Sequence, residues 1–357
     1  MSRMSVWNTR HQYVDRRSSA VCTERLFADR AIAFIYDALW ENAPAVFSLL
    51  TAAWSSRILG FLRYDSFLGS SSAGTAKALR ACGVDLNECT EDPVNLCTAR
   101  ALFERQIRYW ECRPMPEEPE AVVCPADARV LVGSLCETSA LLLKGKFFDL
   151  EELLGRNRMW FKIFQGGDYS IHRLTPDKYH YNHVPAAGRV ADLYEIPGRY
   201  HACNPGAVVT VVTPHSKNRR VVTILDTDAP GGTGIGYVAM IEVAALMVGD
   251  IVQSYCPNRY TAARPLEIGL FIERGAVKSL FRPGGSTTVL LFEPGRIVFA
   301  EDLVANRARS NVQSRFSLGF GRPLVETDVP ARSVLAWRRP NPPSPLPGSS
   351  QEARHGQ

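Results

Sequence analysis

The stretch "RPGGSTTVLLFE", residues 282–293, places a serine at a corner of the chain. Gly284 and Gly285 allow a sharp turn or a close approach of the backbone. The β-branched and aromatic residues that follow Ser286 are typical of a buried strand. Such a serine could simply complete a tight turn, or it could be a nucleophile that needs a base nearby.

Two other stretches carry groups that could assist a nucleophile. His180 and His183 stand three residues apart in "RLTPDKYHYNHVPAAGRV", where Pro176 and Pro185 favour an extended segment over a helix. Beside tyrosines they could equally be packing or surface residues, and the sequence shows no third ligand for zinc. Asp127 occurs in "VVCPADARV", where an aspartate is commonly a turn residue.

In this order, the three stretches resemble motifs of the phosphatidylserine decarboxylase family of self-processing, pyruvoyl-dependent enzymes. Residues 125–127 match the family's P-A-D-G motif, residues 177–185 match D-Y-H-x-x-H-x-P, and residues 285–287 match Gly-Ser-Thr. Further matches are "LLKGKFFDLEELLG", "YHACNP" and "PLEIGLF", so that the resemblance spans roughly residues 96–326.

The chain departs from the family pattern at several places. Ala128 replaces the glycine of P-A-D-G, and "EVAALMVGD", which begins at Glu242 and ends at Asp250, replaces V-G-A-x-x-V-G-S. Residues 272–283 are an extra segment before Gly284. These departures leave the matched aspartate, histidines and serine unchanged, and they fall where substrate specificity could be set.

The resemblance implies Ser286 as the nucleophile, His183 as its base and Asp127 as the carboxylate that orients the base. Ser286 would attack the carbonyl of Gly285, its own upstream neighbour. Cleavage through an ester would leave a pyruvoyl group at residue 286 and two associated chains, 1–285 and 286–357.

The resemblance also implies a cofactor and a second histidine role. The pyruvoyl group derived from Ser286 would act as the electron sink for decarboxylation, and His180 would handle a proton. Tyr179 and Tyr181 could instead hold His180 as a wall residue. No metal is expected.

The implied function is a carboxy-lyase that converts phosphatidylserine to phosphatidylethanolamine at a membrane surface. The same machinery could instead decarboxylate a free amino acid, aromatic ones included. An inactive relative that serves as a binding scaffold is a third hypothesis. Backbone cleavage and assays with lipid or free amino acids would separate the three.

The composition is that of a globular protein, with 46% hydrophobic and 22% charged residues among 357. The net charge of +5 suits an anionic membrane surface, but the Lys and Arg residues are not dense enough for nucleic acid. Nine scattered cysteines without a C-x-x-C pair indicate reduced thiols in the cytoplasm.

The pattern of apolar residues predicts an α+β fold. A helical region at residues 1–115 is indicated by "RLFADRAIAFIYDALW" and "TARALFERQIRYW". A β-rich sandwich or barrel-like body at 116–337 is indicated by short runs such as "AVVTVVT", "RRVVTIL" and "STTVLLFE", interrupted by one helix in "FFDLEELLG". Residues 338–357 form a Pro- and Ser-rich tail that we expect to be disordered.

The helical region could attach the protein to a membrane. The uncharged stretch 42–56 is too short to span a bilayer, and an interfacial helix fits better. The same residues could equally form a core or a homodimer interface. We expect a cytoplasmic protein, peripheral on the inner face of the cell membrane. The apolar residues at helical spacing are Phe34, Ile35, Leu39, Trp40, Phe47, Leu49, Leu50 and Trp54.

Overall fold

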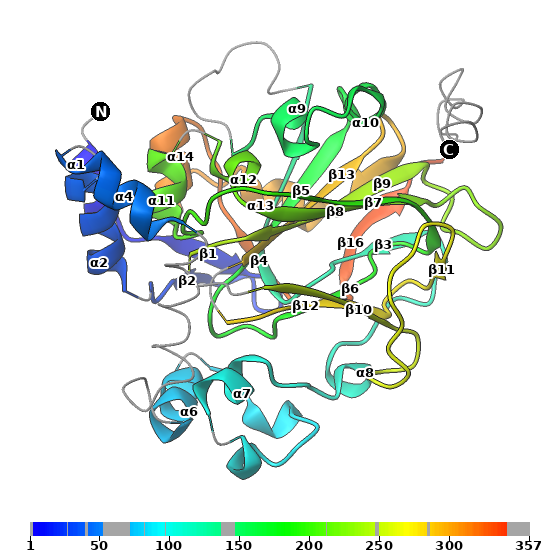
Figure 1. Cartoon of the computed structure of the whole chain (residues 1–357), viewed down its shortest axis with the longest axis horizontal. Helices are drawn as coiled ribbons and strands as arrows, with labels where there is room; N and C mark the ends of the chain where they lie inside the picture. Colours follow the sequence, from blue (N-terminus) through cyan, green and yellow to red (C-terminus); the bar gives the residue numbers. More distant parts are fainter. Residues whose placement is uncertain are drawn as a thin grey trace.

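The computed structural model describes residues 3–26, 28–39, 42–52, 72–81, 83–96, 98–136, 147–211, 213–246, 250–283 and 286–340. A large, mostly antiparallel sheet forms the centre of the molecule (Figure 1). Two small sheets pack against one face of it, and short helices cover the other face. The predicted α+β class with a β-rich body is confirmed.

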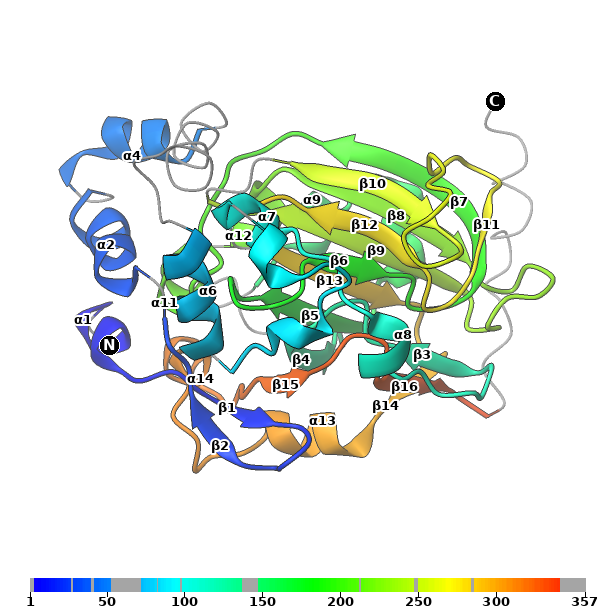
Figure 2. The ribbon, with the colours of Figure 1, turned by 90° about the horizontal axis from the view of Figure 1, so that it is seen from below.

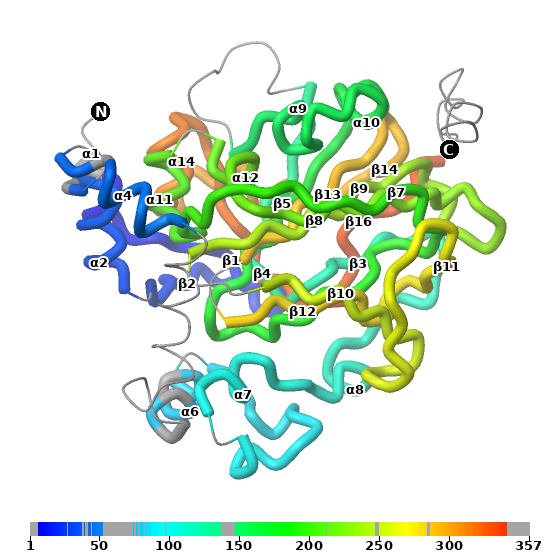
Figure 3. The backbone as a smooth tube through the Cα atoms, in the orientation of Figure 1, coloured from blue at the N-terminus to red at the C-terminus, as the bar shows by residue number. Residues whose placement is uncertain are grey.

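The large sheet contains ten strands within the described ranges, and only β15 and β1 pair in parallel. Their order is β11 (Phe271–Ile272), β7 (Gly188–Ile196), β8 (Arg220–Asp226), β9 (Tyr237–Ala244), β13 (Ser286–Phe292), β5 (Asp168–Leu174), β4 (Ala128–Ser134), β15 (Thr327–Val329), β1 (Gln12–Asp15) and β2 (Val21–Thr23). The tube of Figure 3 shows β13 running between β5 and β9, two strands far from it in the sequence.

The two small sheets have three strands each in the part of the chain that the structure describes. One has the order β10 (Ile251–Cys256), β12 (Val277–Phe281) and β6 (Tyr181–His183), and the other has the order β14 (Ile297–Phe299), β16 (Val334–Arg338) and β3 (Ala121–Val123). The extra segment 272–283 contains β12, which is the central strand of the first small sheet and pairs with β6. It is therefore part of the body beside the two histidines.

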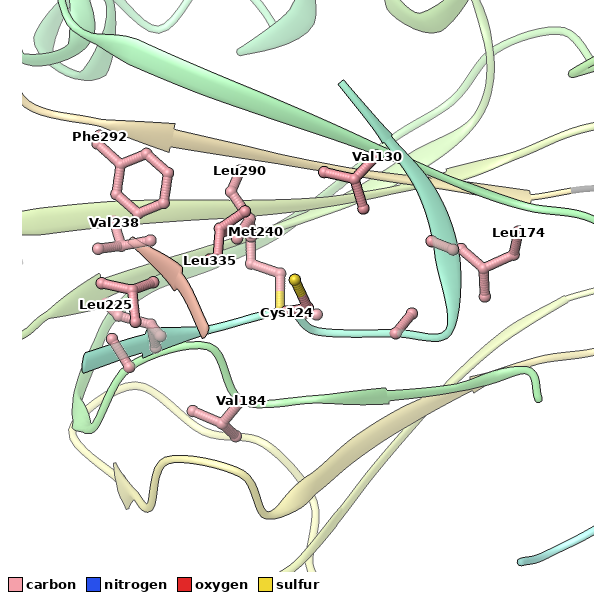
Figure 4. Packing of buried hydrophobic residues seen from close by; sticks show 14 of the residues in the cluster. Cys124, Val130, Leu174, Val184, Leu225, Val238, Met240, Leu290, Phe292 and Leu335 are labelled. Atoms are coloured by element: carbon pink, nitrogen blue, oxygen red, sulfur yellow. The ribbon is translucent and has the colours of Figure 1, made fainter. Parts of the chain in front are cut away.

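Alternation along the central strands creates two cores. Leu290 of β13 and Met240 of β9 point toward the small sheets, where they pack with Cys124 and Leu335 (Figure 4). Val289 precedes Leu290 on β13 and points to the opposite face, where it joins the core beneath the helices. Both faces of β9 and β13 are buried, so the apolar runs Val238–Ile241 and Val289–Phe292 are continuous rather than alternating with polar residues.

The helices that follow β4 in the chain pack mainly on the face of the large sheet opposite the small sheets. They are α9 (Leu150–Leu153), α10 (Arg158–Phe164), α11 (Pro205–Thr210), α12 (Pro214–Lys217) and α14 (Arg315–Phe320), while α13 (Glu301–Arg307) lies against β4. The prediction of a single helix inside the β-rich body was therefore incomplete.

The run "AVVTVVT", residues 207–213, was predicted as a strand, but its first four residues belong to α11. The Asn204 side chain accepts a hydrogen bond from the Gly206 N–H at 2.9 Å, and Pro205 occupies the first helical position. These two residues start a helix, and burial of Val208 under the sheet outweighs the strand preference of valine.

The described parts of residues 1–115 form helices on two sides of the body (Figure 2). Beside one end of the large sheet lie α1 (Arg3–Asn8), α2 (Asp29–Phe34), the π-helix η1 (Ile35–Leu39) and α4 (Pro44–Leu50). Over the first small sheet lie α6 (Ser72–Ala81), the 3₁₀ turns η2 (Leu86–Glu88) and η3 (Pro93–Asn95), α7 (Ala99–Phe103) and α8 (Tyr109–Cys112). The region also supplies β1 and β2 to the large sheet, which the helical pattern did not predict.

None of the helices in the described ranges is long and apolar enough to cross a bilayer. The predicted boundary between residues 115 and 116 and the predicted disorder of residues 338–357 stay predictions. Trp40 and Trp54, named above for membrane contact, lie outside the described residues. Phe47 is only 8% exposed, and its ring stacks on His201 and meets Tyr36 edge-on. Phe47 is thus a core residue.

Candidate active site

Ser286 is the first residue of β13 and is fully buried. It lies opposite Leu174 of β5 on one side and Ala244 of β9 on the other. Its Oγ has no hydrogen-bond partner among the described residues, which is costly for a buried hydroxyl. Gly285, whose peptide bond to Ser286 would be cleaved, and its neighbour Gly284 lie outside the described residues.

His180 immediately precedes β6 and is also fully buried. Its ring lies 3.6 Å, between ring centroids, from Phe103 of α7. Nδ1 donates to the Lys178 carbonyl at 2.8 Å, because a carbonyl can only accept, and Nε2 has no partner in the described part of the chain. Burial lowers the pKa of His180 to about 3. The ring is neutral near pH 7 and keeps one nitrogen able to accept a proton.

His183 is the last residue of β6, and its ring orientation is fixed at both nitrogens. Nδ1 donates to the Gly275 carbonyl at 2.9 Å, so Nε2 accepts from the Tyr179 hydroxyl at 3.2 Å. Tyr179 in turn shares a 2.8 Å hydrogen bond with Tyr260. Burial lowers the pKa of His183 to about 4. His183 is therefore a neutral ring near pH 7.

Asp127 lies in the turn between β3 and β4 and bonds to Arg113. Both carboxylate oxygens accept from the Arg113 guanidinium at 2.8 Å, and one also accepts from the Ala331 N–H at 2.7 Å. Burial alone would raise the pKa of Asp127, but Arg113 outweighs it and lowers the pKa to about 2. Arg113 also donates two 3.0 Å hydrogen bonds to Glu88.

The structure places Asp127, His183 and Ser286 in neighbouring elements, but their side chains do not bond to each other. The His183 N–H donates to the Pro125 carbonyl at 2.6 Å, which places the end of β6 beside the Asp127 turn. Asn182 contacts the large sheet, and successive residues of a strand point to opposite faces. His183 therefore points away from that sheet, toward Tyr109 of α8. Within the described residues, no hydrogen bond joins Asp127, His183 and Ser286.

A cavity of about 430 Å³ opens beside Asp127. Its walls carry both signs of charge. The cations are Arg17, Arg105, Arg113 and Lys178, and the carboxylates are Asp15, Asp85, Glu88, Asp127, Asp177 and Asp328. A wall with both signs can hold a ligand that itself carries an amine and an acid.

A group with the spacing of metal ligands occurs elsewhere in the described residues, at His11, Glu24 and Glu326. Arg173 of β5 donates at 2.6 Å to each of the two glutamates. His11 Nδ1 accepts from the Arg315 N–H, so its Nε2 donates to Glu326 at 2.8 Å. The arrangement is a salt-bridge cluster that fastens the β1–β2 end of the sheet to β5.

Sequence patterns missed several residues that contact the candidate site. Arg113 and Tyr260 bond to site residues through long-range contacts that no local pattern marks. Glu242 and Lys278 gave a usable signal, because each is the single charged residue of its strand. A charge in a buried strand requires a partner of opposite sign.

The comparisons agree with the motif resemblance. The family model for phosphatidylserine decarboxylase matches residues 99–317. A phosphatidylserine decarboxylase proenzyme from Bordetella petrii is 32% identical over 235 residues, which is 62% of this chain and 78% of the relative. Proenzymes of the same name from Chlamydia pneumoniae and Fusobacterium nucleatum are 29% and 25% identical, each over 86% of this chain and 95% of the relative.

Proposed function

The chain belongs to the phosphatidylserine decarboxylase family, and from this premise we propose that it is a carboxy-lyase that converts phosphatidylserine to phosphatidylethanolamine. We propose further that its cofactor is a pyruvoyl group made from its own Ser286. The observation that carries this proposal is the family match over residues 99–317, a range that contains Asp127, His180, His183 and Ser286. The relatives' name, proenzyme, agrees with a chain that is processed.

Self-cleavage follows from serine chemistry at the start of β13. The Ser286 hydroxyl adds to the Gly285 carbonyl, its proton passes to the base, and the peptide C–N bond breaks to give an ester. Elimination then breaks the Cβ–Oγ bond, frees the Gly285 carboxylate and leaves dehydroalanine at residue 286. Water then adds to Cα of residue 286. Its oxygen becomes the ketone oxygen of the pyruvoyl group, and the former amino nitrogen leaves as ammonia.

The roles of base and orienting carboxylate are carried to His183 and Asp127 from the motif match. A neutral ring at His183 and an ionised carboxylate at Asp127 support these roles, since a base must arrive unprotonated. In the uncleaved chain, however, His183 Nε2 is held by Tyr179 and Asp127 is held by Arg113. To take the proton of Ser286, His183 must break its bond with Tyr179 and turn toward the large sheet that carries Ser286.

The residues around Ser286 suit the proposed cofactor. Once formed, a pyruvoyl group would supply the electrophilic carbonyl and the electron sink on which loss of carbon dioxide depends. The buried Oγ of Ser286, without a partner in the described part of the chain, supports its role as precursor. His180, with a neutral ring and an uncommitted Nε2, supports the role of moving a proton at that position.

The two cleaved chains should stay together because β13 is held on both sides. All seven of its residues pair with β5 and with β9, which belong to the other chain after cleavage. Exposed apolar residues on α2 and α4 support peripheral contact with a membrane, for which we propose the cytoplasmic face.

Intact mass and substrate assays test the proposal. The purified wild type should give two masses, for residues 1–285 and 286–357 with a pyruvoyl terminus, and Ser286→Ala should stay one chain. The processed protein should release carbon dioxide from phosphatidylserine vesicles and leave free amino acids unchanged. A wild type that stays uncleaved would refute self-processing, and activity on free amino acids alone would replace the phospholipid with a soluble substrate.

A further inference from the structure

A buried polar network lies between the β10–β12–β6 sheet and the large sheet, on the face of β13 that Ser286 shares. We call it the interlayer network, and it consists of Asn182, Glu242, Gln253, Lys278, Ser279 and Thr288. Neither its charges nor its hydroxyls have a part in the chemistry proposed above.

The centre of the interlayer network is an ion pair with no exposed surface on either side chain. Lys278 Nζ donates to Glu242 Oε2 at 2.7 Å and to Gln253 Oε1 at 2.7 Å. Gln253 Nε2 donates to the same Glu242 oxygen at 2.6 Å. A charge buried this deeply is retained only where hydrogen bonds compensate it.

A β-bulge turns the two donors on β12 toward this carboxylate. The register of β12 against β6 shifts between Val277 and Ser279. In a regular strand Lys278 and Ser279 would point to opposite faces, yet both donate to Glu242. The bulge therefore lies where it aims two neighbouring side chains at one carboxylate of the large sheet.

The hydrogen bonds of the network fix the orientation of one amide. The Glu242 carboxylate can only accept hydrogen bonds, and the Ser279 hydroxyl already uses its proton to donate to it. The Asn182 NH₂ group must therefore be the donor to both the Glu242 carboxylate and the Ser279 oxygen. Asn182 Oδ1 is thereby directed at β13, where the Thr288 hydroxyl donates to it at 2.9 Å. This orientation admits a hydroxyl donor on β13 and excludes an acceptor.

The bond between Asn182 and Thr288 connects the two strands that bear the matched residues. Thr288 is two residues after Ser286 on β13, so the two side chains share a face of the strand. Asn182 is adjacent to His183 and two residues after His180. A shift between β6 and β13 would change the distance from the histidines to Ser286, and this bond resists it.

We propose that Thr288 and Asn182 are positioning residues for the chemistry at Ser286, and that the Glu242–Lys278 pair acts through them by fixing the Asn182 amide. The inference rests on the proposed function. It makes the hydroxyl at position 288, rather than the bulk of the side chain, a determinant of the rate of self-cleavage.

The test is the time course of self-cleavage after cell-free synthesis, followed on denaturing gels for the wild type and three variants. Thr288→Val keeps the shape of the side chain but removes the hydroxyl, and it should cleave at least about tenfold more slowly because a small misplacement of reacting groups has large effects. Thr288→Ser restores the hydroxyl and should cleave within about twofold of the wild type. Thr223→Val is the matched control, because Thr223 is buried in β8, two strands from β13, with no partner for its hydroxyl among the described residues.

Melting temperatures are measured on the same substitutions in a Ser286→Ala background. They separate an effect on the position of the reacting groups from an effect on the stability of the fold. Thr288→Val leaves the buried Asn182 Oδ1 without a donor and Thr288→Ser removes a buried methyl group, so both should lower the melting temperature, whereas only Thr288→Val should slow cleavage. Equal rates for the wild type and Thr288→Val, or equally slow rates for both 288 variants, would overturn the inference and leave the proposed function intact. An uncleaved wild type would overturn the proposed function itself.

Discussion

Burial lowers the pKa of both histidines at β6, to about 3 for His180 and about 4 for His183. Both rings are neutral at pH 7, but their nitrogens differ in commitment. His183 is bonded at Nδ1 and Nε2, whereas His180 keeps a buried Nε2 that has no partner in the described residues. The two histidines, three residues apart, therefore differ in which ring nitrogens are free to exchange a proton.

The residue-scale prediction separates the two histidines. His183→Ala and His183→Gln should both fail to cleave, because neither replacement can accept the proton of Ser286. The glutamine retains hydrogen-bonding capacity toward Tyr179 and Gly275, so it should fold closer to the wild type. His180→Ala should still cleave, at least in part, yet its processed form should decarboxylate slowly. Gel analysis and carbon dioxide release measure the two steps separately.

A different outcome would contradict this division of labour. If the alanine variants at 180 and 183 lose cleavage to the same extent while both remain folded by circular dichroism, the two rings act as one unit. The glutamine variant serves as the control for folding, since it removes the base while keeping polar contacts at that position.

The resemblance of short motifs to a family pattern pointed to Asp127, His183 and Ser286, because such motifs are local, and their roles stay predictions. The motifs did not predict how these residues are bonded. The carboxylate of Asp127 was expected beside His183, yet its partner is Arg113, which approaches from the helical region. Such a contact depends on the tertiary fold, which no short motif encodes.

At the scale of elements, α11 and β12 show where local patterns are insufficient. The Val-rich start of residues 207–213 is helical because Asn204 and Pro205 begin a helix there. The segment 272–283 seemed an addition to the common pattern, yet it supplies the central strand beside β6. In both cases a neighbouring element decides the structure, through a cap in one and strand pairing in the other.

The element-scale prediction concerns the start of α11. Asn204→Ala should lower the free energy of unfolding by about 1–2 kcal/mol, because it removes the bond to the Gly206 N–H. Asn204→Ser should restore most of this loss, since a serine hydroxyl can also cap a helix. Urea unfolding of the uncleaved Ser286→Ala chain measures both values.

Asn204→Ser also distinguishes two causes of the stability loss, the missing helix cap and the missing contact with α2. Asn204 Nδ2 donates to Asp29 of α2 at 2.9 Å, a bond that serine is too short to replace. If the serine variant is as unstable as the alanine variant, the contact with α2 rather than the helix cap stabilises this part of the molecule.

At the scale of the whole molecule, buried histidines predict acid sensitivity. Burial lowers the pKa of five of them to about 3 or 4, and these are His172, His180, His183, His201 and His215. Below the ordinary pKa of about 6.5 the unfolded chain takes up protons that the folded chain does not. Stability is therefore complete above that pH and falls as the pH drops toward 4.

The expected loss of unfolding free energy on acidification is large. From pH 7 to pH 5.5, each such histidine costs about 1 kcal/mol of unfolding free energy, so the five together could remove about 5 kcal/mol. Urea unfolding of the Ser286→Ala chain at the two pH values measures this difference. His215→Gln should reduce the difference by about one fifth, since it removes one of five buried rings. Identical urea midpoints at the two pH values would contradict the prediction.

The end of the molecule formed by α2, η1 and α4 carries the features that a membrane surface would bind. Phe34 is 58% exposed and Val46 is 46% exposed, whereas Phe47 packs inward. Arg30 is exposed on the same helix as Phe34. Apolar burial at about 25 cal/mol per Å² would supply most of the affinity, and each arginine near an anionic surface would add about 1 kcal/mol.

Flotation with liposomes tests this contact. The wild type should float with the vesicles, more strongly as anionic lipid increases, and moderate salt should weaken binding only in part because apolar burial is not screened. Phe34→Glu/Val46→Glu should remain in the soluble fraction while keeping the wild-type melting temperature, since both side chains already face solvent. Ile268→Glu is the matched control, because Ile268 is an exposed apolar residue three positions before β11. Figure 1 shows β11 on the side of the molecule opposite α2 and α4. If the wild type stays soluble at every lipid composition, the surface does not bind membranes and a soluble substrate becomes the better hypothesis.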